Sequence, residues 1–202
     1  ENIEHRLATR HGPVVDESEG RPLSWRVGGY RDFGALRQLF DMGAAHDVDE
    51  FNRVLDRMQL STFHAVYADA AGNIAYRYNA TTGMRVDPEL AAQSAGLQSE
   101  DDLSYLYTRP LSSAGGHFEW GATMPPDSMP WLLNPESGYI QACGTPPWLA
   151  TSPSPISEDA FPAWFIRDDD SYRAKRVRRL FAIGPRSFED MQAMLFDTVS
   201  PL

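Results

Sequence analysis

Cysteine is almost absent from this sequence, in which Cys143 is the only one among 202 residues. A single thiol cannot form an intramolecular disulfide, so a disulfide-stapled fold is excluded and stability must come from a packed core. The hydrophobic fraction of 42% is sufficient for one ordinary domain or two small ones. Cys143 paired with His117 lacks a third supporting group, and we interpret the cysteine as structural.

Two further features are missing: a long apolar run and an excess of basic residues. No stretch of about 18 apolar residues is present, so no membrane-spanning helix is predicted. The 18 basic and 28 acidic side chains give a formal net charge of −10, and a surface of this sign repels phosphate backbones and anionic headgroups. We expect neither nucleic acid nor a membrane as a partner. Because Glu1 begins no signal peptide, we expect a mature or excised piece of a protein.

Hydrophobic periodicity predicts a mixed α and β chain. Extended-chain formers predict strands over residues 3–15 and 23–27 with a polar loop between them, and a hairpin of residues 63–69 and 74–79 that turns at Gly72-Asn73. Apolar residues at helical spacing predict amphipathic helices with one buried side. The predicted buried side chains are Phe33, Leu36, Leu39 and Phe40 in residues 32–42, then Phe51, Val54, Leu55 and Met58 after a cap at Asp47 or Asp49, then Ala174, Val177, Leu180 and Phe181 in residues 172–183, and Met191, Met194 and Leu195 after Ser187.

Residues 133–147, LNPESGYIQACGTPP, form the segment whose composition demands the most careful placement of the backbone. Asn134-Pro135 and Ser137-Gly138 are turn signals, and residues 139–140 are predicted to be a short strand that enters a loop of small residues. Two prolines end that loop. From the residues alone, both a functional loop and an ordinary β-turn-β corner remain open.

Several short patterns, taken together and in order, resemble the large subunit of the penicillin acylase family. They are Arg10-His11-Gly12-Pro13-Val14-Val15, Asp49-Glu50-Phe51, Tyr67-Ala68-Asp69 with Gly72-Asn73-Ile74-Ala75-Tyr76, Trp120-Gly121, the order NP-x-SG-x-I-Q-x-C-x-x-x-P from Asn134, Pro162-Ala163-Trp164, and Arg173. The resemblance implies an α+β chain that is part of an N-terminal nucleophile hydrolase αββα sandwich with mainly antiparallel strands. It also implies that residues 1–202 are a single fragment of the large subunit, with a rim insert over residues 86–116 that begins with a short helix at Asp87-Pro88-Glu89.

Enzymes of this family use a nucleophile freed at a chain start by self-cleavage, whose own α-amino group takes the proton while an acyl-enzyme forms. Glu1 cannot be that nucleophile, so we expect it on the remaining acylase polypeptide, which includes the small subunit. The resemblance further implies a small-molecule amide substrate of β-lactam or acyl-homoserine-lactone type and a periplasmic or secreted location.

The family's oxyanion-hole asparagine lies in a pattern Asn-x-Asn-x-x-Pro, whose two asparagine places are Ala142 and Gly144 here. The resemblance therefore implies that Gly144 and Thr145 form the oxyanion loop and that Arg173 supports it. Loss of one such donor typically lowers turnover by about 10²- to 10³-fold, so the parent protein either solves this problem differently or is inactive. Tyr139, Gln141, Ala142 and Cys143 are the predicted acyl-pocket neighbours.

The sequence departs from the family pattern at two further positions and also permits other functions. His64 replaces a usual asparagine and is predicted to be a hydrogen-bonded, partly buried histidine. Gly83 replaces a proline before Arg85, which either holds a carboxylate of the substrate or pairs with a local acid at the surface.

No cofactor is expected, and the Asp168-Asp169-Asp170 run lacks the loop of a calcium site, so no metal ligands are assigned. The rival functions are a catalytically inactive scaffold, a carbohydrate or peptide groove built from Trp120, Trp131, Trp148 and Trp164, and a glycosidase pair of Glu119 and Asp69.

Overall fold

A computed structural model describes residues 7–199 apart from residues 98–106, 108, 167 and 185–186. The helices are α1 (Ala35–Gly43), α2 (Val48–Leu55), α3 (Pro88–Ser94), α5 (Tyr172–Phe181) and α6 (Phe188–Met194). The strands are β1 (Ala8–Thr9), β2 (Gly12–Ser18), β3 (Arg21–Ser24), β4 (Thr62–Ala68), β5 (Ile74–Ala80), β6 (Gly83–Arg85), β7 (Trp120–Thr123) and β8 (Trp131–Leu133). Within this described part, no helix has the length and apolar character needed to cross a bilayer.

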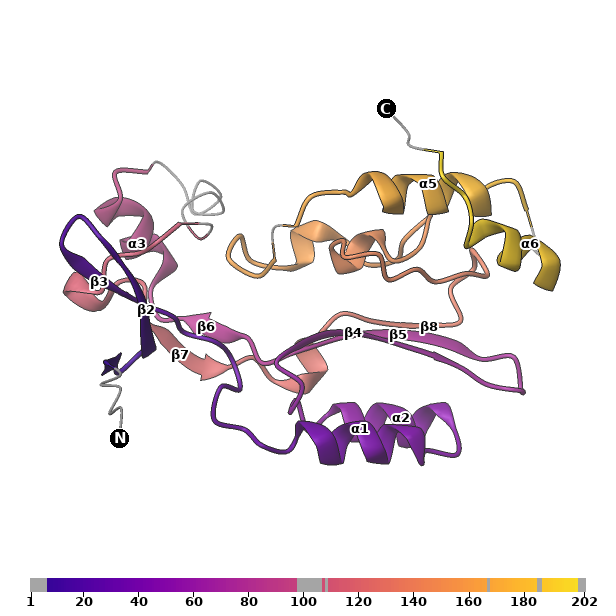
Figure 1. Cartoon of the computed structure of the whole chain (residues 1–202), viewed down its shortest axis with the longest axis horizontal. Helices are drawn as coiled ribbons and strands as arrows, with labels where there is room; N and C mark the ends of the chain where they lie inside the picture. The colour runs from indigo at the N-terminus through magenta and orange to yellow at the C-terminus, as the bar shows by residue number, and fades with distance from the viewer. Residues whose placement is uncertain (1–6, 98–106, 108, 167, 185–186, 200–202) are drawn as a thin grey trace, which may run out of the picture.

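The centre of the molecule is an antiparallel sheet with the strand order β4-β5-β8. One face of the sheet carries α1 and α2, and the other carries a layer of coil that α5 and α6 cover from outside (Figure 1). The smaller sheets β1-β2-β3 and β6-β7 lie together with α3 at one end of the molecule. The α+β class with antiparallel strands is thus confirmed, and the described residues supply one helical layer and one sheet of the expected sandwich.

The predicted hairpin is present as β4-β5, with a register from Thr62 opposite Ala80 to Ala68 opposite Ile74. Its turn is closed by the Asp69 carboxylate, which accepts hydrogen bonds from the Asn73 backbone N–H at 2.9 Å and side-chain amide at 2.8 Å. Gly72 alone adopts the left-handed backbone, with φ of 89°. The turn therefore needs glycine for its conformation and asparagine for its hydrogen bonds.

The two faces of β5 contribute to different cores because alternate side chains point to opposite sides of a strand. Tyr76, Tyr78 and Ala80 pack with Leu132 and Phe165 beneath the coil layer. On the helical side, α2 packs through the predicted stripe. Phe51 and Leu55 are buried against Ala65, Met58 is buried in the coil-side core, and Asp47 caps the helix by accepting the Glu50 N–H at 2.7 Å.

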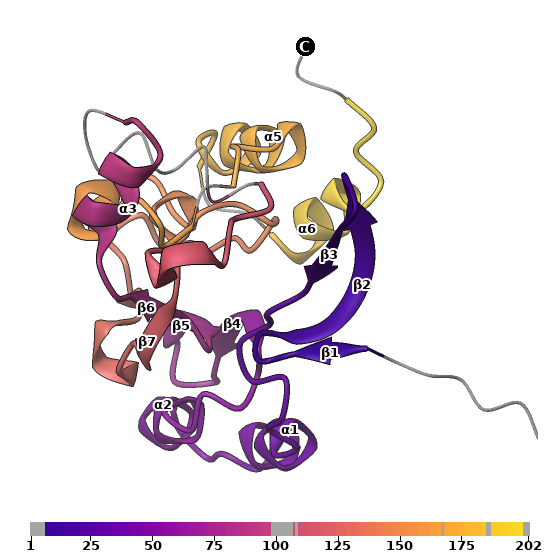
Figure 2. The ribbon, with the colours of Figure 1, turned by 90° about the vertical axis from the view of Figure 1, so that its left-hand side faces the viewer.

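The predicted burial of the α1 stripe is wrong for the described residues. Phe33, Leu36 and Phe40 are 92%, 81% and 72% exposed, and Leu39 is also exposed. The side chain that α1 buries is Gln38. The helical period was read correctly, but its apolar side is exposed although α1 lies beside α2 under the sheet (Figure 2), so local periodicity chose the wrong side.

The predicted loop over residues 16–22 is also wrong, because this segment is the β2-β3 hairpin. Glu19 and Gly20 have φ of 52° and 73°, and Ser18 pairs with Arg21 across this two-residue turn. Positive φ at both positions matches the twist of the flanking strands, which explains a tight hairpin in a polar sequence. The following strand ends at Ser24 rather than at residue 27, and residues 3–6 of the first predicted strand lie outside the described residues.

The C-terminal helices begin where predicted. Ser171 caps α5 by accepting the Ala174 N–H at 3.2 Å, and Ser187 and Asp190 form a capping box at α6. The α6 stripe is not core, since Met191 and Leu195 are exposed. In the rim segment, Asp87 caps α3 as expected, whereas the acidic residues 99–102 lie outside the described residues.

A buried network of side-chain amides joins α1 to the sheet, and we expect it to contribute to the stability of the fold. Gln38 donates to the Asn79 side chain at 3.0 Å, and Asn79 donates to the Leu55 carbonyl at 2.7 Å. Asn79→Ala leaves both partners unsatisfied inside the protein, so we expect the free energy of unfolding in urea to fall by about 2–4 kcal/mol. Thr62→Val removes an exposed hydroxyl from the same sheet and is expected to change it by less than about 0.5 kcal/mol. Equal losses in the two variants would contradict this account.

Candidate functional site

The loop that follows β8 is held closed at its base by hydrogen bonds between its two ends. The Gln141 N–H donates to the Ala150 carbonyl at 2.7 Å, and the Thr151 hydroxyl donates to the Tyr139 carbonyl at 2.9 Å. Residues 139–140 are therefore not the predicted strand, because their polar groups are satisfied within the loop instead of in a ladder. Asn134, with φ of 47°, ties the start of the loop to the β4-β5 turn through the Ile74 N–H at 2.8 Å.

The tip of this loop meets the first turn of α5. The Arg173 guanidinium donates to the Cys143 carbonyl at 2.9 Å, and the Ser171 hydroxyl donates to the same oxygen at 3.4 Å. Gly144 follows with φ of 67° and is exposed. Arg173 and Cys143, which the family resemblance assigns to one site, are thus in contact, and two hydrogen bonds hold the carbonyl that precedes the exposed corner at Gly144.

The corner presents hydrogen-bond donors that the protein does not use itself. Among the residues that the structure describes, none accepts a hydrogen bond from the backbone N–H of Gly144 or of Thr145. Thr145 is buried, and the hydrogen bonds found among the same described residues include none from its hydroxyl. Two adjacent backbone N–H groups and one hydroxyl are the kind of donors that can stabilise a developing oxyanion.

Of the four predicted acyl-pocket residues, Cys143 and Ala142 lie at the corner, whereas Tyr139 and Gln141 make their contacts elsewhere. Gln141 is buried and donates to the Leu149 carbonyl at 2.9 Å, while its Oε1 is buried without a partner. Ala142 is exposed beside the corner. Tyr139 stacks on Phe181 with ring centroids 4.6 Å apart, at the opposite end of α5 from Arg173, which is about 12 Å along a helix. Tyr139 lines a shallow hollow there together with Ser137, Ser152, Lys175, Arg178, Arg179, Phe181 and Ala182.

The sequence and the fold of this chain are similar to those of known proteins. The family model described as penicillin amidase matches residues 2–202. The chain belongs to this family. Penicillin acylase 2 proenzyme of Pseudomonas sp. (strain SE83) is 26% identical over 203 residues, a match that covers 96% of this chain and 22% of the relative. The solved thermostable penicillin G acylase from Alcaligenes faecalis has the same fold, with a TM-score of 0.67 and 18% identity over 94% of this chain and 30% of that one. The chain thus spans less than a third of either protein.

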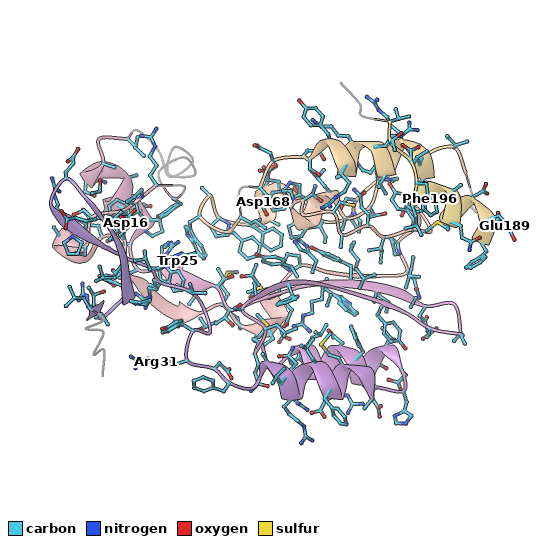
Figure 3. The ribbon with its side chains drawn as sticks, in the orientation of Figure 1. Asp16, Trp25, Arg31, Asp168, Glu189 and Phe196 are labelled. Carbon is cyan, nitrogen blue, oxygen red and sulfur yellow. The ribbon has the colours of Figure 1, made fainter. Side chains whose placement is uncertain are left out.

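His64 belongs to a polar cluster of which the sequence predicted only this histidine. His64 on β4 is hydrogen-bonded through Nδ1 to the Tyr76 hydroxyl at 2.9 Å, as the sequence predicted, and its ring lies 5.2 Å from that of Tyr78. Burial lowers the pKa of His64, and the pKa of Tyr78 is raised to about 12 by burial and by the charge of Asp168. Asp168 lies just before α5, above the sheet (Figure 3). The cluster therefore connects the sheet with the segment that carries Arg173, and only pairing across the hairpin reveals it.

The tryptophan groove receives little support from the packing. Trp148 stacks on Phe161 at 6.3 Å between centroids, and both lie against the core, as does Trp164. These aromatics fasten the proline-rich loop to the sheet. Trp120 lies on β7 against Gly83 and, like Trp164, beside the guanidinium of Arg85, so these two rings surround a cation while Trp148 packs within the loop.

The carboxylates considered for other chemistry are engaged in structural contacts. Glu119 pairs with Arg10 and Arg26, and Asp69 holds the hairpin turn. Asp170 pairs with Arg178. Across the described part of the chain, no group of three His, Cys, Asp or Glu side chains is arranged to hold a metal ion.

The His64 cluster predicts a specific pH dependence of stability. Burial lowers the pKa of His64 below its usual 6.5 in the folded protein, so below 6.5 the unfolded chain binds a proton that the native state does not. This part of the stability is present above pH 6.5 and is lost as the pH falls from there toward the folded pKa. His64→Asn removes the titration. We expect urea unfolding at about pH 7.5 and about pH 5.5 to show the variant gaining on the wild type at the lower pH, and a difference independent of pH would contradict this.

Proposed function

We propose that this chain supplies the oxyanion side of an enzyme that hydrolyses a linear amide of an N-acylated small molecule through an acyl-enzyme. Membership in the penicillin amidase family supports the general class of acylase-like amide hydrolases. The contact between Arg173 and the Cys143 carbonyl is the observation that supports this site. It fixes the corner at Gly144, where no described residue accepts a hydrogen bond from the backbone N–H of Gly144 or of Thr145. The substrate class we propose is a β-lactam or an acyl-homoserine lactone.

The proposed reaction divides the work between this chain and the rest of the protein. A nucleophile on polypeptide outside these 202 residues attacks the amide carbonyl, and its α-amino group takes the hydroxyl proton and passes it to the leaving amine as the C–N bond breaks. Water then hydrolyses the ester. In both steps the carbonyl oxygen becomes negatively charged, and the N–H groups of Gly144 and Thr145 would donate to it. Arg173 would act as a positioning residue, since it holds the carbonyl that precedes Gly144.

Exposed apolar surface supports the proposal that the remaining acylase polypeptide packs on this chain. Phe33 just before α1 and Leu36 and Phe40 on α1 are exposed, and Leu195 and Phe196 are exposed beyond α6. Apolar patches of this kind mark interaction surfaces. The relative named a proenzyme is several times longer than the matched segment, since the match covers 22% of it. Processing of a precursor is consistent with that name, and for the parent protein we propose both processing and a periplasmic or secreted location.

A catalytically inactive scaffold is the second candidate function. The observation that favours it is the absence of a side-chain amide at Ala142 and Gly144, where the family pattern has asparagines. The backbone N–H groups and the Thr145 hydroxyl would then have to stabilise the oxyanion without an amide, and loss of one such donor typically lowers turnover by about 10²- to 10³-fold.

Gly144→Asn in the intact protein tests the proposed function. Asparagine tolerates the left-handed backbone better than other side chains, and a Cβ at this position would contact only Arg173 Nη2, at 3.8 Å, so we expect the variant to fold. It would add an amide donor at the corner. We expect kcat for a chromogenic phenylacetyl or long-chain acyl amide to rise by at least about tenfold, with KM little changed.

Gly144→Val is the matched control for this experiment. A β-branched residue is strained at φ of 67° and offers no donor, so we expect a lower melting temperature and no gain in turnover. If both variants change turnover equally, the corner does not face the reacting carbonyl. If neither the wild type nor Gly144→Asn cleaves any of the amides, the scaffold function replaces the enzyme.

A further inference from the structure

The Arg85 side chain on β6 is surrounded by aromatic rings instead of the local acid that was one sequence-based expectation. Its guanidinium carbon lies 4.7 Å from the ring centroid of Tyr107, 5.2 Å from that of Trp120 and 5.9 Å from that of Trp164. These rings come from three separate segments of the chain. Their convergence on one half-buried cation shows that tertiary folding builds this environment.

Gly83 makes room for one of these rings. A Cβ atom built on Gly83 would lie 2.6 Å from Cε3 of Trp120, closer than real side-chain contacts allow. The indole therefore lies directly on the backbone of β6, two residues before Arg85. The glycine that stands where the family has a proline is thus tied to the aromatic surroundings of the arginine.

Arg85 has no counter-charge among the described residues. No carboxylate within that part of the chain lies at ion-pair distance from it, and its Nε is buried without a hydrogen-bonded partner. Glu119, the acid beside Trp120, is already engaged by Arg10 and by Arg26 Nη1 at 3.2 Å. Two guanidinium groups thus already share this carboxylate, although the formal net charge of the chain is −10.

An arginine cannot relieve this situation by losing its proton, because its pKa remains far above neutrality in proteins. Burial and the nearby charge of Arg26 lower the pKa of Arg85, which reflects the cost of keeping it charged here. Aromatic faces compensate only part of the lost hydration. The half-buried guanidinium of Arg85, whose Nε has no hydrogen-bonded partner among the described residues, is therefore suited to bind an anion that fits between flat rings.

We propose that Arg85 anchors a binding site for a small, flat organic carboxylate, with Tyr107, Trp120 and Trp164 around the ligand and Arg26 as a second positive charge. A guanidinium matches the plane and the two oxygens of a carboxylate. The aromatic surroundings favour an apolar, planar body on the anion over inorganic phosphate. This site does not depend on the oxyanion corner, so either assignment can fail without the other.

Calorimetric titration of the intact protein with sodium benzoate tests the site. We expect saturable binding of benzoate to the wild type and none of benzamide, which has the same shape without the charge. Arg85→Gln should weaken benzoate binding at least tenfold. Arg85→Lys, which keeps the charge and packs similarly, should weaken it less, because it loses the paired donors.

Arg53→Gln is the matched control, because it removes an exposed arginine from α2 and should leave benzoate binding unchanged. Thermal unfolding of each variant verifies that it is folded. Absence of saturable benzoate binding to the wild type would overturn the proposal and would mean that an acid of the protein already neutralises Arg85. Equal affinity in the wild type and in both Arg85 variants would also overturn it, by placing the anion on the other basic residues.

Discussion

Strand β5 is the constraint on which the rest of the structure depends, because it is hydrogen-bonded on both edges and packed on both faces. Its two tyrosines, Tyr76 and Tyr78, support the coil layer through Phe165. On the helical side, Arg77 is buried and bonds to the Asp56 carboxylate and to the Pro126 carbonyl, both at 2.7 Å. A buried arginine of this kind needs every partner in place, and so it couples α2, β5 and the segment before β8.

The candidate site follows from that scaffold by way of the loop after β8. β5 positions β8, Asn134 ties the end of β8 to the hairpin turn, and the hydrogen bonds at Gln141 close the loop base. The tip then reaches α5, where Arg173 holds it. Each link is a hydrogen bond between backbone groups or to them, which tolerates wide variation of the surrounding side chains. This explains how 18% identity to a solved acylase is compatible with the same fold.

The two arginines with functional proposals illustrate different uses of the same side chain. Arg173 is exposed, so its charge is solvated. It donates a hydrogen bond to the Cys143 carbonyl, and its role is to fix the position of the backbone there. Arg85 is half-buried among aromatic rings, and its charge has no acid beside it in the described residues. The first fits a positioning residue and the second fits an anchor for an anion.

The sequence by itself determined the elements with strong local signals. The hairpin around Gly72, the stripe and cap of α2, and the helix starts at Ser171 and Ser187 follow from turn chemistry, periodicity and capping, which act within a few residues. The ordered motifs also indicated the family. Local sequence patterns could not predict contacts between distant segments of the chain. These include the exposure of the apolar side of α1, the aromatic rings around Arg85, and the separation of Tyr139 from Gly144 along α5. Only the tertiary structure decided these, because each depends on which distant segment packs against a given side chain, and periodicity records that a side is apolar without recording what covers it.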